Sequence, residues 1–498
     1  MTVSVITGLL IQAAALAGVH WAIRGKWLRR PAALMLVAAV AFHGVTELVQ
    51  FAWPGRNFFR GHFSSQAALD DWVLLVSGGI ACYAIMYVFV VLQPQRRRTP
   101  AHAAPGLGLA GVPLPWLLAL LLPLLVATWQ GKGALQPLSP LAAEEAPEAQ
   151  GLMVGLAGGL VVPLIGITAA VVLVRWGMRW LLPTLAVQAL VLVLAGTRSM
   201  IVFAAILTLV GAAVHGLRPS RRQVAALTAL VAVTIAVISS TRAVAGREVF
   251  HADQGSGARV EALIDGAAAL HKPDTRDVLL DDIVYRFDGN TWGAQIYASL
   301  RGSGPTSGMV TVGNNVAMMV PSFLAPGKVT GRSLEERSEE AYLARDHGLS
   351  QRIDWLPTIL GTVIAYYGPA GMLLIALLLG AALGAAERWA LRSRGTARAV
   401  FAVGLAQCAL LYGAGPQSIM TALRVALALT VALAVLAWLH QRRAARAEAP
   451  PTGGPVTVGP VTGDPVTVRQ RTGHRADQGW RDLTSSRRSD LPVSTRSS

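Results

Sequence analysis

The sequence predicts an all-α polytopic membrane protein with about 11 transmembrane helices and a large extracytoplasmic loop between spans 8 and 9. Hydrophobic residues make up 53% of the 498 residues and charged residues 14%, whereas a soluble chain usually carries about 25% charged residues. The apolar residues also lie in blocks of about twenty, which match the ~30 Å hydrocarbon core of a bilayer. Each block is predicted to be a helix, because backbone groups in lipid must bond internally.

The apolar blocks divide the chain into four regions. Residues 1–240 hold predicted spans 1–8, residues 241–355 form the large loop, residues 356–440 hold spans 9–11, and residues 441–498 form a tail. The first block has no basic segment before it, which predicts a retained span rather than a cleaved signal. The predicted spans are residues 3–23, 31–53, 72–93, 109–129, 152–174, 178–195, 199–216, 223–240, 357–385, 399–415 and 417–439.

Arginines and lysines alternate between the short loops. Cytoplasmic loops carry an excess of these residues, and here the odd-numbered loops and the tail are basic while the even-numbered loops are not. This alternation predicts a multi-pass protein of the inner (plasma) membrane with its N-terminus outside and its C-terminus cytoplasmic. The basic residues are Arg24, Lys26, Arg29, Arg30, Arg96, Arg97, Arg98, Arg175, Arg179, Arg218, Arg221, Arg222, Arg388, Arg392, Arg394, Arg398, Arg442, Arg443 and Arg446.

The large loop and the tail differ in composition. The loop contains Tyr285, Trp292 and Phe323 and mixes both charge signs. Long connections of this kind are usually functional, and we expect short helices packed over the outer mouth of the bundle. The tail carries near-repeats of Pro-Val-Thr with Gly, a composition that buries too little apolar surface to become ordered. We therefore expect a disordered cytoplasmic tail.

The charge and cysteine content exclude several other classes of protein. The net charge is +16, but the positive residues lie in short clusters between apolar blocks, which argues against nucleic-acid binding. Cys82 and Cys408 each lie inside an apolar block, as small buried hydrophobic residues do. Neither a disulfide framework nor a metal-ligand spacing is present, so we expect no metal and no cofactor.

Four ionisable residues lie at predicted membrane depth, where a charge costs about 2.5–3.5 kcal/mol and marks a candidate functional position. His43 and Glu47 are four residues apart and share one helix face. Arg198 lies in the short outer turn Gly196-Thr197-Arg198-Ser199, which predicts an anion site at the bundle mouth. For His43 and Arg424, snorkelling to the interface is an equal alternative.

The chemistry of guanidinium groups suggests which anion is bound. An arginine fork matches phosphate oxygens bidentately, and a lipid-linked diphosphate places its charge at this depth. Glycosyl transfer from such a donor requires the leaving diphosphate to be neutralised, which arginines do without metal. It also requires a base that activates the acceptor hydroxyl, and His347, Asp354 and Asp288 in the large loop are candidates.

Four motifs within roughly residues 180–385 carry a resemblance to a known family. They are Gly-Thr-Arg-Ser at 196–199, Arg-Phe-Asp-Gly at 286–289, Val-Pro-Ser-Phe-Leu-Ala-Pro-Gly-Lys at 320–328, and Pro357-Thr358 leading to Tyr-Gly-Pro-Ala-Gly at 367–371. With the topology, this pattern resembles the O-antigen polymerase and ligase superfamily, which polymerises or transfers lipid-linked oligosaccharide repeat units.

The resemblance implies a function and a set of site residues. The implied reaction transfers glycan from undecaprenyl diphosphate to an acceptor sugar hydroxyl at the outer leaflet, with polysaccharide-assembly proteins as further partners and no nucleic acid. Whether the chain acts as polymerase or ligase stays open. The implied catalytic residues are Arg198, Arg286 and His347, and the expected substrate-binding residues are Arg242, Arg352, Asp288 and Lys328.

Two other functions compete with this one. A membrane glycosyltransferase that uses a polyprenyl monophosphate sugar tends to carry acidic residues in an early outer loop, where this chain has Asp70 and Asp71; a polar helix start explains the same residues. A lipid-linked glycan flippase or exporter usually has internal repeats, and the sequence shows no such symmetry.

Overall fold

The computed structural model describes residues 1–54, 65–94, 112–130, 148–194, 198–246, 248–250, 256–305, 313, 339–348, 358–393 and 395–448. Within these residues the chain forms helices and no strand, which confirms the predicted all-helical class. The chain divides into a compact unit, Met1–Gln441, and a second unit, Arg442–Ser498. The predicted disordered tail lies, after residue 448, outside the described residues.

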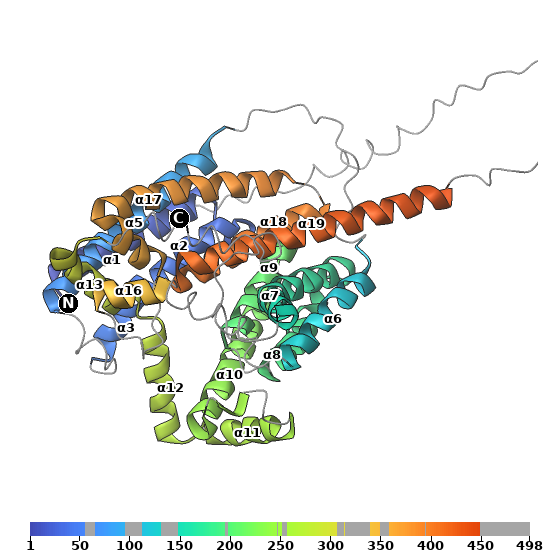
Figure 1. Cartoon of the computed structure of the whole chain (residues 1–498), viewed down its shortest axis with the longest axis horizontal. Helices are drawn as coiled ribbons and strands as arrows, with labels where there is room; N and C mark the ends of the chain where they lie inside the picture. The colour runs from blue at the N-terminus through green and yellow to red at the C-terminus, as the bar shows by residue number, and fades with distance from the viewer. Residues whose placement is uncertain are drawn as a thin grey trace, which may run out of the picture. The chain divides into compact units, whose positions relative to one another are not determined.

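The first half of the chain forms the helices up to α10 (Figure 1). Their bounds are α1 Val3–Ala22, η1 Trp27–Arg29, η2 Pro31–Ala33, α2 Leu34–Val40, η3 Ala41–Val45, α3 Thr46–Ala52, α5 Gln66–Leu92, α6 Leu114–Gln130, α7 Glu148–Trp176, η5 Met178–Trp180, α8 Leu181–Leu194, α9 Arg198–Val214 and α10 Arg221–Ala245. In this set η3 is a π-helical turn that joins α2 to α3 without a break.

The second half of the chain forms short helices followed by three long ones. Their bounds are η6 Glu248–Phe250, α11 Ser256–Ala269, α12 Pro273–Arg286, α13 Gly289–Ser303, α16 Glu339–His347, α17 Ile359–Arg392, α18 Gly395–Leu410, η8 Leu411–Ala414 and α19 Gly415–Glu448. Within α17, Gly368 has φ +67° directly before Pro369. Proline disfavours helical geometry in the residue before it, and glycine tolerates this φ, so the helix kinks at the Gly-Pro pair.

Six helices are long and apolar enough to cross a membrane, judged among the described residues alone. They are Val3–Ala22, Pro31–Ala52, Gln66–Leu92, Arg221–Ala245, Ile359–Arg392 and Thr396–Met420. Shorter apolar helices cover Leu114–Val126, Leu160–Trp176, Met178–Val193, Arg198–Val214 and Ala422–Ala432. The fold is thus that of a helical membrane protein, while the count of eleven spans is not confirmed and stays a prediction.

Helix α5 is the centre of one hydrophobic cluster, with α1 and α17 packed along it (Figure 1). Gly380 of α17 lies against the Tyr83 carbonyl, and Gly384 lies against Tyr87 and Val90. Small residues at these positions let the two backbones approach closely. Because the residue numbers rise together on both helices, α5 and α17 run parallel, as spans 3 and 9 of the predicted topology should.

A second hydrophobic cluster is built from α6, α7, α9 and α18. Gly166 of α7 lies against Leu207 of α9, and Gly211 of α9 lies against Ala170 of α7. Helices α7 and α9 therefore also run parallel, as predicted spans 5 and 7 should.

Loops that were predicted to lie on one side of the membrane contact one another. The Arg29 guanidinium, after the first span, donates to the Gly216 carbonyl at 3.2 Å, and the Gln223 amide donates to the Met178 carbonyl at 2.7 Å. These bonds join the first, fifth and seventh loops at one end of the unit. That this end faces the cytoplasm stays a prediction.

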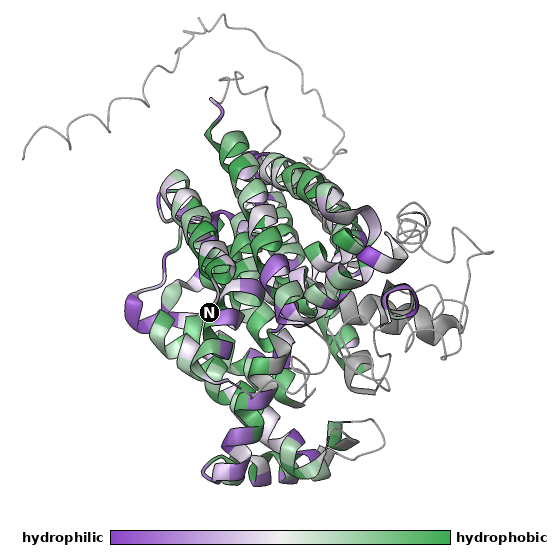
Figure 2. Cartoon of the chain, turned by 90° about the vertical axis from the view of Figure 1, so that its left-hand side faces the viewer, coloured by the Kyte–Doolittle hydropathy of each residue, from purple (hydrophilic) through white to green (hydrophobic). Residues whose placement is uncertain are grey.

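The segment 241–355 forms short helices where the structure describes it. Hydrophilic turns occur along α11 and α12, at the lower end of Figure 2, whereas the long helices are mostly hydrophobic. Helix α13 does not lie on the surface: it packs against α5 and α17, with Trp292 and Ile296 buried. Gly293 lies against the Trp72 indole, which leaves no room for a side chain there. The large loop therefore inserts one helix into the bundle.

Candidate functional site

Arg198 is the first residue of α9 and lies half-buried beside α10. Its Nη1 donates to the Ser239 hydroxyl at 2.6 Å. Arg242 follows Ser239 by three residues, on the same face of α10, and its guanidinium lies 5.8 Å from the centre of the Phe250 ring. Two arginines predicted to act together are thus held on neighbouring helices at one end of the α9–α10 pair.

The large loop begins at this same end. The Ser240 hydroxyl donates to the Gly266 carbonyl of α11 at 2.6 Å, and Gly266 lies directly against Thr241. Helix α11 therefore packs on the turn of α10 that lies between Ser239 and Arg242. The N-terminus of α9 adds the positive end of a helix dipole. Guanidinium groups and backbone N–H groups together make this end suitable for an anion.

A second polar group is buried where α13 meets the π-helical turn Ala41–Val45. His43 is fully buried; its Nδ1 lies 2.7 Å from Asn290 Oδ1, and its Nε2 lies 2.9 Å from the Tyr412 hydroxyl. The His43 ring also meets the Trp72 ring edge-on. These residues come from four segments far apart in the sequence, so the group marks a convergence point of the fold.

Asn290 is the centre of this group. Its Nδ2 donates to the His43 carbonyl at 2.8 Å and to Glu47 Oε1 at 2.8 Å, while its Oδ1 accepts from Trp72 Nε1 at 3.2 Å. This set of partners fixes the orientation of the amide, so His43 Nδ1 must carry the proton toward Oδ1. His43 and Glu47 thus share one face, as their spacing indicated, and both bind the large loop.

Asp288 caps α13. Its Oδ1 accepts from the backbone N–H groups of Asn290 and Thr291 at 3.0 and 2.9 Å, and its Oδ2 accepts from the Thr291 hydroxyl at 2.5 Å. An N-cap carboxylate of this kind stabilises a helix by about 1 kcal/mol. The residue is 2% exposed. The structure gives Asp288 a structural role, and its predicted contact with substrate stays a prediction.

His347 ends α16 and is buried against α13. Its Nδ1 lies 2.7 Å from the Ser299 hydroxyl, which itself donates to the Ile296 carbonyl. Because that hydroxyl proton is used, Ser299 accepts from Nδ1–H, and Nε2 is the basic nitrogen of the ring. Ser299 lies nine residues beyond Asn290, about 14 Å along the helix axis, so His347 and the His43 group flank α13 at separate points.

The packing of α16 is expected to depend on pH. Burial lowers the pKa of His347, and the Asp346 carboxylate acts weakly in the opposite direction. A histidine whose folded pKa is lowered contributes full stability above its unfolded value of about 6.5 and loses it as the pH falls below that value. Amide hydrogen exchange should therefore show α16 protected at neutral pH and increasingly open below about pH 6.5. In His347→Gln this pH dependence should vanish, and equal protection of wild-type α16 at pH 7 and pH 5 would contradict it.

The other predicted site residues are only partly described. Arg286 ends α12, but its side chain lies outside the described residues, as do Arg352 and Lys328 altogether. Arg198 and Arg242 lie together at the end of α9 and α10, whereas Asp288 and His347 lie on or against α13. Helices α9 and α13 pack in different hydrophobic clusters. Within the described residues, no three His, Cys, Asp or Glu side chains gather as metal ligands would.

Residues 411 and 412 connect the His43 group with α9, the helix that begins at Arg198. Tyr412, in the short η8, belongs to the His43 group, and its neighbour Leu411 packs with Cys408 and Ala422 beside Phe203 of α9. Sequence reasoning missed Tyr412 and Asn290. Asn290 follows the Arg-Phe-Asp-Gly motif directly, and that position was the one signal in the sequence that pointed to it.

The acidic pair of the competing glycosyltransferase function has structural partners. Helix α5 begins at Gln66, with the Ser65 hydroxyl as its N-cap, so the polar helix start lies earlier than the predicted span. Asp70 accepts from the Gln66 amide at 2.7 Å, and Asp71 pairs with Arg301 of α13 at 3.3 Å. The Asp71–Arg301 ion pair joins α5 to α13 at an exposed position, where such pairs contribute little to stability.

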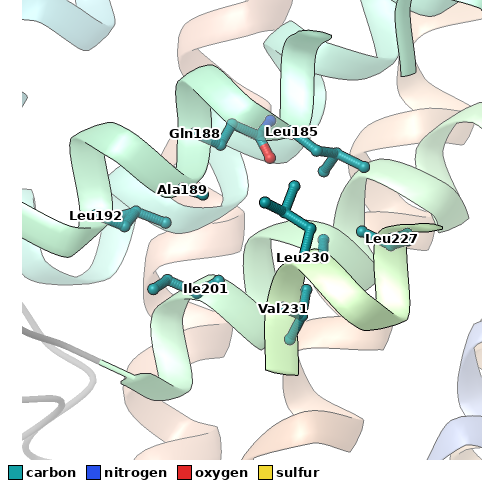
Figure 3. Close-up of a pocket in the computed structure, with 9 residues that line it drawn as sticks. Leu185, Gln188, Ala189, Leu192, Ile201, Leu227, Leu230 and Val231 are labelled. Atoms are coloured by element: carbon teal, nitrogen blue, oxygen red, sulfur yellow. The ribbon is translucent and has the colours of Figure 1, made fainter. Parts of the chain in front are cut away.

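A small cavity lies between α8, α9 and α10 (Figure 3). Its volume is about 10 Å³, which is too small for more than one water molecule. Gln188 and otherwise apolar side chains surround it, among them Leu185, Leu192, Ile201, Leu227, Leu230 and Val231. It is a packing defect rather than a substrate site.

Comparisons with protein-family models, with curated proteins and with solved structures found no match. The function is therefore argued from the geometry and chemistry of the residues described above.

Proposed function

We propose that the protein is a membrane glycosyltransferase that polymerises lipid-linked oligosaccharide repeat units at the outer leaflet of the plasma membrane. One observation carries the proposal: Arg198, held by Ser239, lies with Arg242 at the end of the bundle where the large loop begins. Cations fixed at the edge of an apolar bundle suit a ligand with a charged head and a prenyl tail. Undecaprenyl diphosphate has this chemistry. The proposal includes eleven spans, an outer N-terminus and a cytoplasmic C-terminus.

The proposed reaction is a substitution at an anomeric carbon. The acceptor sugar hydroxyl forms the new C–O bond, and the bond to the diphosphate breaks with its electron pair going to undecaprenyl diphosphate. Arg198 and Arg286 neutralise the charge that grows on this leaving group, as fixed donors do in many enzymes, and Arg242, Arg352 and Lys328 bind substrate. The acceptor proton goes to His347 Nε2, the basic nitrogen defined by the Ser299 contact.

The glycan that accumulates on the lipid carrier when the protein is removed tests this function. The proposal predicts single, complete repeat units on undecaprenyl diphosphate at the outer leaflet. Units that lack one sugar would instead show a monophosphate-sugar-dependent transferase, and complete units retained at the inner leaflet would show a flippase. Either of these results would overturn the proposal.

A further inference from the structure

The turn between α12 and α13 is bound tightly by one span. The Thr46 hydroxyl donates to the Phe287 carbonyl at 2.6 Å, and the Phe42 and Phe287 rings lie 5.5 Å apart. Asn290 binds both His43 and Glu47, as described above. We call the contacts of residues 42–47 with residues 287–290 the clasp. All its hydrogen-bonding side chains are buried.

The π-helical turn makes the clasp possible. In a regular α-helix each backbone carbonyl accepts an intrahelical bond, whereas a π-helical turn changes this pattern and often marks a functional position. Here the His43 carbonyl, which lies in the π-helical turn, accepts a hydrogen bond from Asn290 Nδ2. Gly289 lies against His43, Thr358 and the Phe42 carbonyl, so the loop backbone approaches as closely as a glycine allows.

Simple packing does not require these side chains. A histidine, a glutamate and an asparagine at membrane depth each cost free energy that leucine would not. Buried polar groups that satisfy one another fix one register between two segments. The clasp therefore sets where the loop turn lies to within a hydrogen-bond length, which apolar contacts alone do not do.

Arg286 is the residue that this register positions. It is the last residue of α12, directly before Phe287, whose carbonyl is held by Thr46. We propose that Asn290 is a positioning residue that acts through Arg286: by binding His43 and Glu47 it fixes the backbone position of the residue to which the proposed function assigns the diphosphate of the lipid-linked substrate. This inference rests on the proposed function.

A double-mutant cycle on the full chain in lipid nanodiscs tests the inference, with undecaprenyl diphosphate as the titrated probe. Arg286→Ala should weaken its Kd about tenfold, the value of one hydrogen bond to a charged group. Asn290→Asp keeps the shape of the side chain but removes the two N–H donors, and should weaken the Kd about as much. If Asn290 acts through Arg286, the double variant binds no more weakly than either single variant.

Two further variants guard against loss of folding. Thr46→Val removes the 2.6 Å bond to the Phe287 carbonyl and the longer 3.3 Å contact with the Ala41 carbonyl of its own helix. It should weaken the Kd about threefold, and combining it with Arg286→Ala should again give no additive effect. Gln188→Leu is the matched control: its amide is buried and bonded to Thr208 and the Ile165 carbonyl, away from the clasp. It should lower the unfolding temperature and leave the Kd unchanged. In chain extension, Asn290→Asp and Arg286→Ala should lower kcat alike.

The outcomes separate the inference from the proposed function. A double variant about a hundredfold weaker than wild type, the product of two independent tenfold effects, would overturn the positioning role, as would wild-type binding by Asn290→Asp or Thr46→Val in folded protein. Wild-type binding by both Arg198→Ala and Arg286→Ala would instead overturn the proposed function.

Discussion

Arg198→Ala is expected to stop polymer formation and to leave single repeat units on the lipid carrier. The guanidinium is held by Ser239 at the end of the bundle where α11 packs, so it is fixed before the substrate arrives. Removing one preorganised donor to a developing charge costs about 10²–10³ in kcat. Arg198→Lys keeps the charge but loses the planar fork, and should retain only part of the activity.

The measurement is polysaccharide chain length in cells that make equal amounts of each variant in the membrane. Arg179→Ala is the matched control, because Arg179 lies exposed in η5, next to Met178, which binds Gln223 among the basic loops. That variant should make polymer of wild-type length. Wild-type chain length from Arg198→Ala would remove this arginine from the mechanism.

Arg30→Ala is expected to destabilise the bundle strongly. Glu387 near the end of α17 is fully buried, and Arg30 Nη1 lies 3.2 Å from its Oε1. The Tyr87 hydroxyl donates to the same oxygen at 2.9 Å, and the Ala32 N–H donates to Oε2 at 2.9 Å. Removing the cation leaves a buried carboxylate with neutral partners only, and breaking a buried ion pair in this way costs about 3 kcal/mol or more.

Equilibrium unfolding in mixed micelles measures this effect. Arg30→Leu combined with Glu387→Leu is the informative control, because replacing both partners by apolar residues is often neutral. The double variant should recover part of the stability that Arg30→Ala loses, because the Tyr87 hydroxyl and the Ala32 N–H then lack their acceptor. Unfolding of Arg30→Ala at the wild-type midpoint would show that the pair contributes nothing measurable, as many exposed ion pairs do.

Hydropathy alone located the long helices well. The first predicted span, 3–23, corresponds to α1 at Val3–Ala22, and the second, 31–53, corresponds to the continuous helix Pro31–Ala52. The third was placed six residues late, since α5 begins at Gln66 and the charged Asp70 and Asp71 interrupt the hydropathy of its N-terminal part. Bilayer thickness constrains the apolar part of a helix, but capping residues decide where it begins.

The insertion of α13 was not predictable in the same way. Its sequence mixes Trp292, Ile296 and three glycines with polar residues, a pattern that also suits a helix on the surface. What buries it is complementarity with Trp72 and with the π-helical turn, both distant in sequence. Glu387 was missed for a related reason: it lies just past the predicted end of span 9 and beside Arg388, where a charge looks solvated.

The candidate site was predicted in part. The pairing of Arg198 with the beginning of the large loop followed from topology, because both lie at the same predicted end of neighbouring spans. The role of Asn290 needed three-dimensional contacts, since its side-chain partners His43, Glu47 and Trp72 come from two segments distant in sequence. An asparagine has no sequence signature that tells a buried amide from a solvated one.

Reconstitution tests the central claim most directly. The purified full chain in lipid vesicles is supplied with repeat units on undecaprenyl diphosphate, and both chain length and released undecaprenyl diphosphate are measured. The account predicts longer lipid-linked chains with one carrier released for each unit added, and neither product from Arg198→Ala. Glycan that crosses the bilayer with its length unchanged and no carrier released would contradict it.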